Sequence, residues 1–340
     1  NADLAHLNPG SGCRSGGTAD TSFLYTPRLR FALANPLAGG DTCSPAKPVL
    51  RCLLEETGSP KHLPQSPFTM SLDTLLILEL AVLGLCSGFL AGLLGIGGGM
   101  LMVPFITAIL GKQGLPAELS VKMAIATSMA TIMFTSISSV RAHHKRGAVR
   151  WDIVQRLAPG IVLGALVASM GVFALLKGTA LAIFFGLFVG FSATQMFLDR
   201  KPAPSRQMPG TAGQLAAGGA IGFLSGLVGA GGGFVSVPFM AWCNVAIHNA
   251  VATSAALGFP IALANVIGYV VSGQSVQGLP AGSFGYVWLP ALAVIAVFSV
   301  LTAPLGARMA HQLPVKKLKR VFASLLYVLA AYMLWKGLTG

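Results

Sequence analysis

Charged residues are scarce in this sequence of 340 residues: Asp, Glu, Lys and Arg make up 10% of it, and only ten residues are acidic. A soluble globular domain carries about 25% charged residues, so that class is excluded. Hydrophobic residues make up 54%, and the mean hydropathy is +0.73. Several apolar stretches after residue 72 approach or exceed the ~20 residues that cross a hydrocarbon core of ~30 Å. The composition predicts an integral membrane protein with many crossings.

Motifs for metal binding and nucleotide chemistry are also missing. The five cysteines form no Cys-x-x-Cys or Cys/His spacing for a metal. No Gly-Lys-Ser/Thr P-loop occurs, and a dinucleotide fingerprint would need glycine at Met100 and Phe234. The apolar stretches contain no evident nucleophile–base pair or set of metal ligands. The sequence therefore predicts no cofactor, no ATP hydrolysis and no enzyme active site.

Residues 1–69 do not share the apolar pattern. They are rich in Pro, Gly, Ser and Thr, and they hold six basic and five acidic residues and three of the five cysteines. Because they lack an apolar pattern with which to build a core, we expect a disordered tail or a mistranslated upstream segment. Met70 stands directly before the first apolar stretch, and we expect it to start the protein. The remainder holds seventeen basic and five acidic residues, so +12 of the net charge of +13 belongs to it.

Ten apolar segments follow, five on each side of a polar, proline-containing linker at 199–211. We predict a first membrane repeat over 70–198 and a second over 212–338. The ten segments are 72–94, 97–111, 119–140, 153–176, 179–198, 213–230, 231–247, 250–272, 285–307 and 318–335. The predicted fold class is an all-α polytopic membrane protein with two repeats of about five segments each.

One glycine-rich block occurs in both halves and marks the repeat. GFLAGLLGIGGGMLMVPFI at 88–106 returns as GFLSGLVGAGGGFVSVPFM at 222–240, 134 residues later, with 12 of 19 positions identical. Each glycine costs about 1 kcal/mol against alanine in a helix, and Pro104 and Pro238 follow the glycines and remove an amide donor. We therefore expect unwound backbone at membrane depth, which is tolerated only where protein buries it or water lines it.

These broken segments are candidate binding sites, because N–H groups at the start of a half-helix suit an anion. Glycine-broken segments at matching places in two halves are typical of the substrate site of a secondary transporter. The candidates are Gly97, Gly98, Gly99, Gly231, Gly232 and Gly233. The alternative is that small residues only allow close helix packing, which is sufficient for Gly84, Gly88 and Gly92.

The distribution of basic residues predicts the orientation. They cluster at 141–150, in the 199–211 linker and at 308–320, whereas 273–284 contains no charge. Because short cytoplasmic loops collect Lys and Arg, we place the clusters inside and the neutral loop outside. The basic loop of the first half corresponds to the neutral loop of the second, which predicts inverted repeats. The segment 97–111 covers only about 22 Å as a helix, so we expect 8–10 membrane segments, some of them broken or re-entrant.

Hydroxyl groups within the segments are further candidates. The motif Ala-Thr-Ser occurs at 126–128 and again at 252–254. Such hydroxyls bind oxyanions or bridge helices, and back-bonding to a carbonyl one turn earlier is the alternative. The expected substrate ligands are Thr127, Ser128, Thr253 and Ser254. Asn265 follows the second Ala-Thr-Ser motif, and the corresponding part of the first half is the hydroxyl-rich stretch 131–139.

Ionisable residues within the segments are few. Glu79 is a candidate coupling residue, because an intramembrane carboxylate is costly and marks function by default. Snorkelling, or pairing near a membrane interface, is the alternative for Glu79. We expect His143 and His144 on a basic loop that faces lipid headgroups, and not as a metal pair. No metal site is predicted.

The order and duplication of these motifs resemble the sulfite exporter TauE/SafE family. The first half has GLLGIGGGMLMVPF at 92–105, Ala-Thr-Ser at 126–128 and HHKRG at 143–147. The second has GAGGGFVSVP at 229–238, Ala-Thr-Ser at 252–254 and GARMAHQLP at 306–314. The resemblance covers roughly 71–338 and implies an inner-membrane carrier for sulfur-containing or other organic anions, such as sulfite, sulfonates or sulfoacetate. A shared fold does not carry the substrate with it.

The resulting prediction is a secondary transporter in a bacterial cytoplasmic membrane that exports a small anion by alternating access. Its predicted partners are that anionic substrate and the lipid bilayer; no nucleic acid is expected, and assembly as a homo-oligomer stays open. A carrier of another substrate class, such as a metal cation, is the first alternative. An intramembrane enzyme and a non-transporting scaffold are the others.

Overall fold

The computed structural model describes residues 73–95, 97–198, 207–310 and 315–339, with side chains from Arg320 onward in the last range. The expected tail at 1–69 and residues 199–206 of the expected linker lie outside the described residues. The chain divides into two units, Asn1–Lys61 and His62–Gly340, and all described helices belong to the second.

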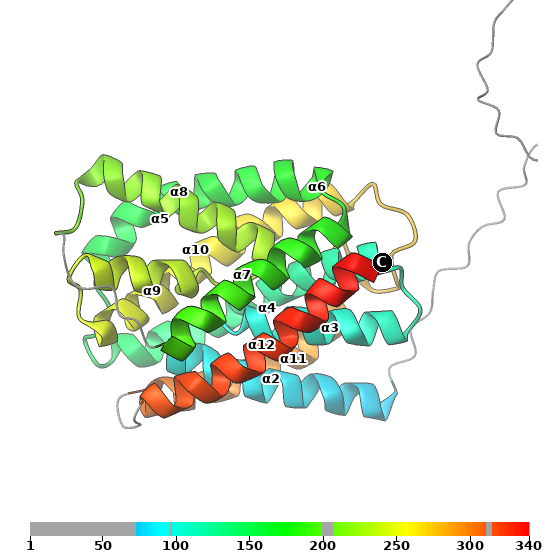
Figure 1. Cartoon of the computed structure of the whole chain (residues 1–340), viewed down its shortest axis with the longest axis horizontal. Helices are drawn as coiled ribbons and strands as arrows, with labels where there is room; N and C mark the ends of the chain where they lie inside the picture. The colour runs from blue at the N-terminus through cyan, green and yellow to red at the C-terminus, as the bar shows by residue number, and fades with distance from the viewer. Residues whose placement is uncertain (1–72, 96, 199–206, 311–314, 340) are drawn as a thin grey trace, which may run out of the picture. The chain divides into compact units, whose positions relative to one another are not determined.

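The described helices follow the ten predicted apolar segments in order (Figure 1). Eight are long and apolar enough to cross a membrane: α2 (Thr74–Leu94), α4 (Ala117–His144), α5 (Trp151–Leu166) with its π-helical and α-helical continuations η1 (Val167–Val172) and α6 (Phe173–Leu175), α7 (Gly178–Leu198), α8 (Thr211–Val228), α10 (Ile247–Gly273), α11 (Leu289–Met309) and α12 (Val315–Thr339). Two are short, α3 (Gly99–Lys112) and α9 (Gly233–Trp242). The prediction of an all-α polytopic membrane protein is confirmed.

One segment begins later than predicted. Residues expected to open the segment at 285 instead form an antiparallel pair of two-residue strands, β1 (Ser283–Phe284) and β2 (Val287–Trp288). Gly285 between them has φ +56°, a left-handed conformation that glycine adopts without a Cβ penalty. Because of this turn, the helix begins at Leu289 and not at residue 285, although the residues around the turn are apolar.

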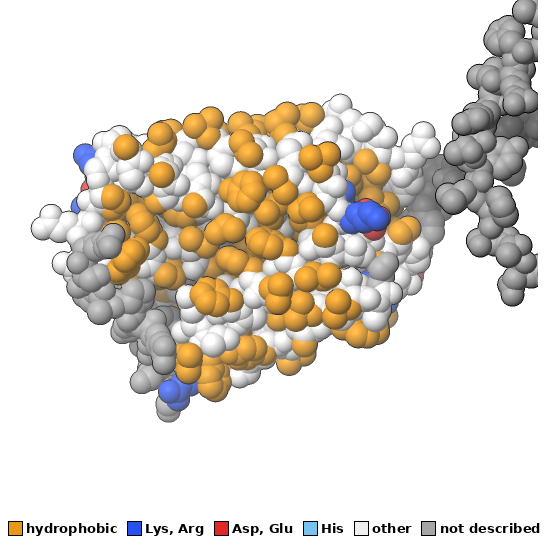
Figure 2. All heavy atoms as spheres, turned by 45° about the horizontal axis from the view of Figure 1, so that its top comes forward, with side chains coloured by type: hydrophobic (Ala, Val, Ile, Leu, Met, Phe, Trp, Pro, Cys, Tyr) orange, Lys and Arg blue, Asp and Glu red, His pale blue; other side chains and the backbone are white. Residues whose placement is uncertain are grey.

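The surface of the helical unit is apolar between its two ends. On the face drawn in Figure 2, hydrophobic side chains cover the middle, and Lys, Arg, Asp and Glu lie toward the ends. Leu163 on α5 and Val167 at the start of η1, like Val297 and Leu301 on α11, expose about three fifths of their surface. Such a band would be unfavourable in water and matches the hydrocarbon core of a bilayer.

Basic residues gather at one end of the bundle, which we call the basic end. The Arg146 guanidinium, in the turn directly after α4, donates a hydrogen bond to the Arg308 carbonyl at the end of α11 (3.5 Å). The Arg150 amide, just before α5, donates to the Thr253 hydroxyl near the start of α10 (3.0 Å). The end of α4, the starts of α5 and α10, and the end of α11 therefore lie together.

The other end, which we call the neutral end, holds the uncharged connection between α10 and α11. The Trp288 amide, just before α11, donates to the Thr127 hydroxyl on α4 (3.0 Å). The Lys122 ammonium near the start of α4 lies 3.5 Å from the Ala174 carbonyl at the end of α6. In Figure 1 this connection and the C-terminus are at the right.

Glycine residues bring pairs of long helices into close contact. A Cβ at Gly88 or Gly92 of α2 would lie 2.3 or 2.0 Å from the carbonyl of Ser299 or Ala303 on α11. In the other half, a Cβ at Gly222 of α8 would lie 2.1 Å from an α5 carbonyl. The close-packing role considered for Gly84, Gly88 and Gly92 is confirmed, and the corresponding pair α5–α8 packs in the same way.

The two short helices turn back toward the end from which their long neighbours came. Lys112 at the end of α3 lies 3.9 Å from Glu79, two turns into α2, so α2 and α3 form a hairpin that opens at the neutral end. Because α8 runs alongside α5 and α9 leads directly into α10, the hairpin of α8 and α9 opens at the basic end. The two hairpins therefore enter the bundle from different ends.

Candidate functional site

Both glycine blocks interrupt the helix, as predicted, and the glycines on each side of the interruption are left-handed. Gly95 (φ +67°) ends α2 and Gly229 (φ +72°) ends α8. Gly98 (φ +72°) precedes α3, and Gly232 (φ +74°) precedes α9. We call 95–99 and 229–233 the two glycine breaks. An L side chain at any of these four positions would be strained.

The two glycine breaks contact each other inside the bundle. A Cβ placed on Gly97 would lie 2.9 Å from the Gly231 Cα, and one placed on Gly99 would lie 2.1 Å from the Gly229 carbonyl oxygen. Only glycine allows this approach. The structure therefore brings together backbone that is about 134 residues apart in sequence.

The serines of the two Ala-Thr-Ser motifs bond the glycine breaks reciprocally. Ser128 on α4 donates to the Gly229 carbonyl (3.0 Å), and Ser254 on α10 donates to the Gly95 carbonyl (3.0 Å). Gly95 and Gly229 are equivalent positions of the repeated block. Each half therefore satisfies the last carbonyl group of the other half's broken helix.

The threonines of the same motifs form a second reciprocal pair. Thr127 accepts from the Trp288 amide and Thr253 accepts from the Arg150 amide, each at 3.0 Å. Both amides stand one residue before a membrane helix, α11 or α5. Since all four predicted hydroxyls are fully buried and engaged with backbone, in this conformation they join the halves and leave little capacity for a ligand.

A small cavity of about 10 Å³ lies between the two glycine breaks. Gly95 and Gly97 line it from the first break, Gly231 from the second, and Ser254 from α10. Ser139 of α4 also lines it, with only 2% of its surface exposed. No described residue hydrogen-bonds to the Ser139 Oγ, although buried hydroxyls normally have a partner. The cavity therefore presents an unsatisfied hydroxyl between the two breaks.

Asn265 on α10 stands at the corresponding sequence position of the second half, but it does not line the cavity. Asn265 and Ser139 each lie twelve residues after the threonine of their Ala-Thr-Ser motif. The Asn265 amide donates to the Ile261 carbonyl (2.8 Å), whereas its Oδ1 has no partner among the described residues. Ser139 was visible in the sequence only as one of several hydroxyls.

Lys122 is a candidate that sequence reasoning missed. It lies in the second turn of α4 with 7% of its surface exposed, and its ammonium is 5.8 and 5.7 Å from the ring centres of Phe173 and Tyr286. Burial raises the pKa of the Tyr286 phenol, and the charge of Glu118 raises it further. The signal in sequence was a lysine inside an apolar segment, which marks function by default.

Glu79 and the histidines lie away from the glycine breaks. Glu79 is partly exposed and pairs with Lys112, which is the interface pairing held as its alternative. The expectation for His143 was wrong: α4 extends to His144, and His143 is buried with its Nε2 3.2 Å from the Gly92 carbonyl. His144 is exposed and accepts from the Trp151 indole (3.1 Å). Within the described ranges, no three His, Cys, Asp or Glu side chains group to hold a metal ion.

Comparisons with known proteins agree with this architecture. The model of the family described as sulfite exporter TauE/SafE matches residues 80–333. A probable membrane transporter protein of Haemophilus influenzae is 36% identical over 261 residues, covering 76% of this chain and 98% of the relative. Relatives in Methanocaldococcus jannaschii (27% over 270 residues; 78% and 98% covered) and Bacillus subtilis (YunE, 26% over 285 residues; 76% and 97% covered) are also named probable membrane transporter proteins.

No solved structure matches the chain. The family match nevertheless spans both glycine breaks, both Ala-Thr-Ser motifs and Ser139. This multi-pass membrane protein, a membrane transporter by its relatives, belongs to the sulfite exporter TauE/SafE family.

Proposed function

We propose that the protein is a secondary transporter that exports small sulfur-containing or organic anions, such as sulfite or sulfonates, across a bacterial cytoplasmic membrane. The family description supports the substrate class, and basic residues at one end support the orientation. The proposed route runs between the two glycine breaks. The protein acts as a carrier without enzymatic turnover, and its energy comes from a gradient.

The unsatisfied Ser139 hydroxyl in the cavity between the breaks is the observation that carries this proposal. Gly97 and Gly231 line this cavity, and helices α3 and α9 begin two residues after them, at Gly99 and Gly233. The first N–H groups of a helix have no partner within it, and the helix dipole makes that end favourable for negative charge. Two helix starts and a hydroxyl therefore offer donors to an oxyanion, in the manner of other transporters with broken helices.

The present cavity is closed to such an anion. Its volume of about 10 Å³ is at the lower limit for a single water molecule. Transport therefore requires the two halves to separate here. The reciprocal serine and threonine bonds join equivalent elements of the two halves. The bond between Thr127 and Trp288 lies at the neutral end, and the bond between Thr253 and Arg150 lies at the basic end. We propose that breaking the first opens the site to one membrane face and that breaking the second opens it to the opposite face. This is alternating access by inverted repeats.

Lys122 supplies positive charge on the neutral side of the route. It lies six residues, less than two helical turns, before Ser128 on the same helix. Its ammonium lies near a carbonyl and two aromatic rings, and the charge of Glu118 also acts on it, but no carboxylate among the described residues lies within ion-pair distance. A largely buried cation of this kind attracts a passing anion.

The test is sulfite counterflow into proteoliposomes containing wild-type protein or Ser139→Ala. We expect the KM for sulfite to rise about tenfold or more, because a hydrogen bond to a charged group is worth roughly 1.5–3 kcal/mol. The unfolding midpoint should stay unchanged or rise, since the wild-type hydroxyl has no partner to lose. Ser169→Ala is the control: Ser169 is equally buried, but bonds the Ala165 carbonyl (2.8 Å) outside the cavity.

An unchanged KM for sulfite in Ser139→Ala would show that the anion does not pass through this cavity.

Adding nickel(II) to the same assay distinguishes an anion carrier from the first alternative, a carrier of metal cations. Inhibition by nickel(II) together with nickel(II) uptake would favour a cation carrier, whereas competition by sulfonates and none by nickel(II) is the result expected here.

A further inference from the structure

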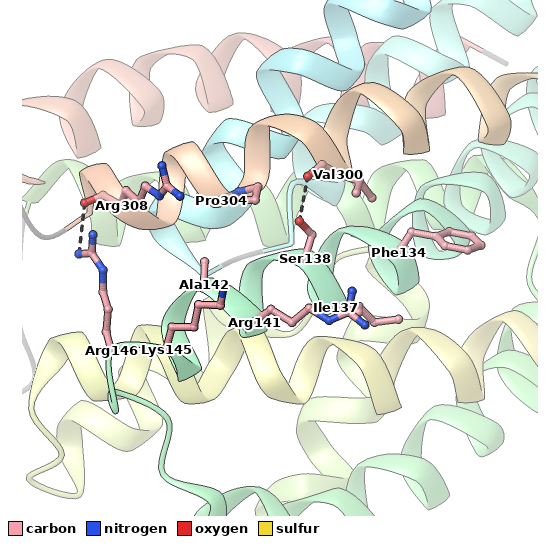
Figure 3. Close-up of a pocket in the computed structure, with 10 residues that line it drawn as sticks. All are labelled: Phe134, Ile137, Ser138, Arg141, Ala142, Lys145, Arg146, Val300, Pro304 and Arg308. Atoms are coloured by element: carbon pink, nitrogen blue, oxygen red, sulfur yellow. Dashed lines mark hydrogen bonds between the residues drawn. The ribbon is translucent and has the colours of Figure 1, made fainter.

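A second hollow lies at the basic end, between α4 and α11 (Figure 3). Its volume is about 750 Å³. The residues that line it are Phe134, Ile137, Ser138, Arg141, Ala142, Lys145 and Arg146 from α4 and the following turn, and Val300, Pro304 and Arg308 from α11. We call it the α4–α11 groove. It is large enough for a headgroup and the first part of an acyl chain.

One part of the α4–α11 groove is strongly basic. Arg141, Lys145, Arg146 and Arg308 are all exposed, and none of the ten lining residues is acidic. Figure 3 shows Lys145, Arg146 and Arg308 at the left, where α4 and α11 end, and the Arg141 side chain extending along α4 toward Ile137. Four cations in a hollow with no acidic residue among those that line it favour an anionic ligand.

The other part of the groove is apolar and extends along the helices into the membrane-spanning region. Phe134 lies two turns before Arg141 on α4, and 42% of its surface is exposed. Ile137, Val300 and Pro304 complete this part; in Figure 3 they lie between Phe134, at the right, and the ends of α4 and α11. A ligand that matches the whole groove is therefore amphipathic, with its anionic end at the membrane surface.

The groove is separate from the cavity between the glycine breaks. Ser138, which lines the groove, donates to the Val300 carbonyl (2.8 Å). Thr135, which lines the central cavity, bonds Ser299 (2.8 Å), and both residues are buried. These two bonds join α4 to α11 between the hollows. The groove and the central cavity thus lie on different sides of the contact between α4 and α11.

We propose that the α4–α11 groove binds an anionic phospholipid. The phosphate of the headgroup would contact Arg141 and Arg308, and an acyl chain would lie against Phe134 and Val300. Basic hollows between membrane helices on the cytoplasmic side are suited to anionic lipid headgroups. The site holds α4 against α11, which come from different halves of the chain, so its lipid stabilises the contact between the halves. The proposal does not depend on which anion is transported.

The test is a titration of the full-length protein in detergent with phosphatidylglycerol or phosphatidylcholine of equal chain length, followed by the unfolding midpoint. Phosphatidylglycerol should raise the midpoint at a lower concentration than phosphatidylcholine. In the double variant Arg141→Gln/Arg308→Gln, the phosphatidylglycerol concentration that gives half of the midpoint shift should rise about 30-fold. This factor corresponds to the loss of two basic residues that each contribute about 1 kcal/mol at an anionic lipid surface. Arg156→Gln/Lys177→Gln removes two exposed cations outside the groove and should titrate as wild type.

Two further arms distinguish a lipid from a free anion. Ile137→Trp fills the apolar part and keeps all four cations, so it should weaken the response to phosphatidylglycerol. Sodium phosphate at the same concentration should give no shift in any variant. Equal titrations of wild type and Arg141→Gln/Arg308→Gln would overturn the proposal. A full response to sodium phosphate that Ile137→Trp leaves unchanged would also overturn it, by showing a simple anion site.

Discussion

At the scale of single residues, the buried hydroxyls of the two Ala-Thr-Ser motifs act on backbone of the other half. Ser128 and Ser254 bond the glycine breaks, and Thr127 and Thr253 bond the amides that precede α11 and α5. The duplication of the motif in the sequence predicted that these four residues share a functional role. Their partners were not predictable, because each bond spans more than 100 residues of sequence.

Replacing the threonines tests this reciprocal arrangement. Thr127→Val leaves the Trp288 amide without its acceptor in a fully buried place, so we expect the free energy of unfolding to fall by about 1–3 kcal/mol. Thr253→Val should cost less, because the Arg150 amide is only partly buried. Unfolding by denaturant in micelles measures both. The exposed Thr339→Val is the control and should change stability by less than about 0.5 kcal/mol; a loss there equal to that of Thr127→Val would contradict the account.

At the scale of elements, the helix breaks were the part of the fold that the sequence predicted best. Three adjacent glycines followed by a proline are so unfavourable in a helix that the interruption follows from propensity alone. The sequence left open whether the short segments are half-helices or arms of a hairpin. That choice depends on where α3 ends relative to α2, and the proximity of Lys112 to Glu79 answers it.

Two glycine-to-alanine variants separate close packing from helix propensity. In Gly99→Ala the new methyl group would lie 2.1 Å from the Gly229 carbonyl oxygen, whereas at Gly171 no atom lies within 4 Å. We expect Gly99→Ala to lower the free energy of unfolding by about 1–3 kcal/mol through overpacking. Gly171→Ala should raise it by roughly 0.5–1 kcal/mol. Circular dichroism during thermal unfolding compares the two, and equal effects would show that the breaks do not need this contact.

At the scale of the whole molecule, the two hairpins enter from different ends and the basic residues gather at one of them. The charge pattern along the sequence predicted this polarity, because Lys and Arg avoid translocation across the membrane. It could not predict the contact between the breaks, which follows from packing α4 against α10 and α11. The inverted-repeat relationship stays a prediction that these contacts support.

Labelling from one side of the membrane tests the orientation. Lys145→Cys lies at the basic end and Gln277→Cys at the neutral end, and both positions are exposed. In intact cells, with the native cysteines replaced, a membrane-impermeant maleimide should label Gln277→Cys alone. Lys145→Cys should react only after the cells are opened. Labelling of Lys145→Cys in intact cells would reverse the proposed orientation.

The most direct test of the central claim is accumulation of ³⁵S-sulfite in proteoliposomes preloaded with unlabelled sulfite. The account predicts accumulation above protein-free vesicles for wild type and Gly171→Ala. It predicts a loss of at least tenfold for Gly99→Ala at equal protein content, because this methyl group lies where the breaks must separate and close again. If wild type accumulates neither sulfite nor a sulfonate, or if folded Gly99→Ala transports at the wild-type rate, the claim that an anion passes between the glycine breaks is wrong.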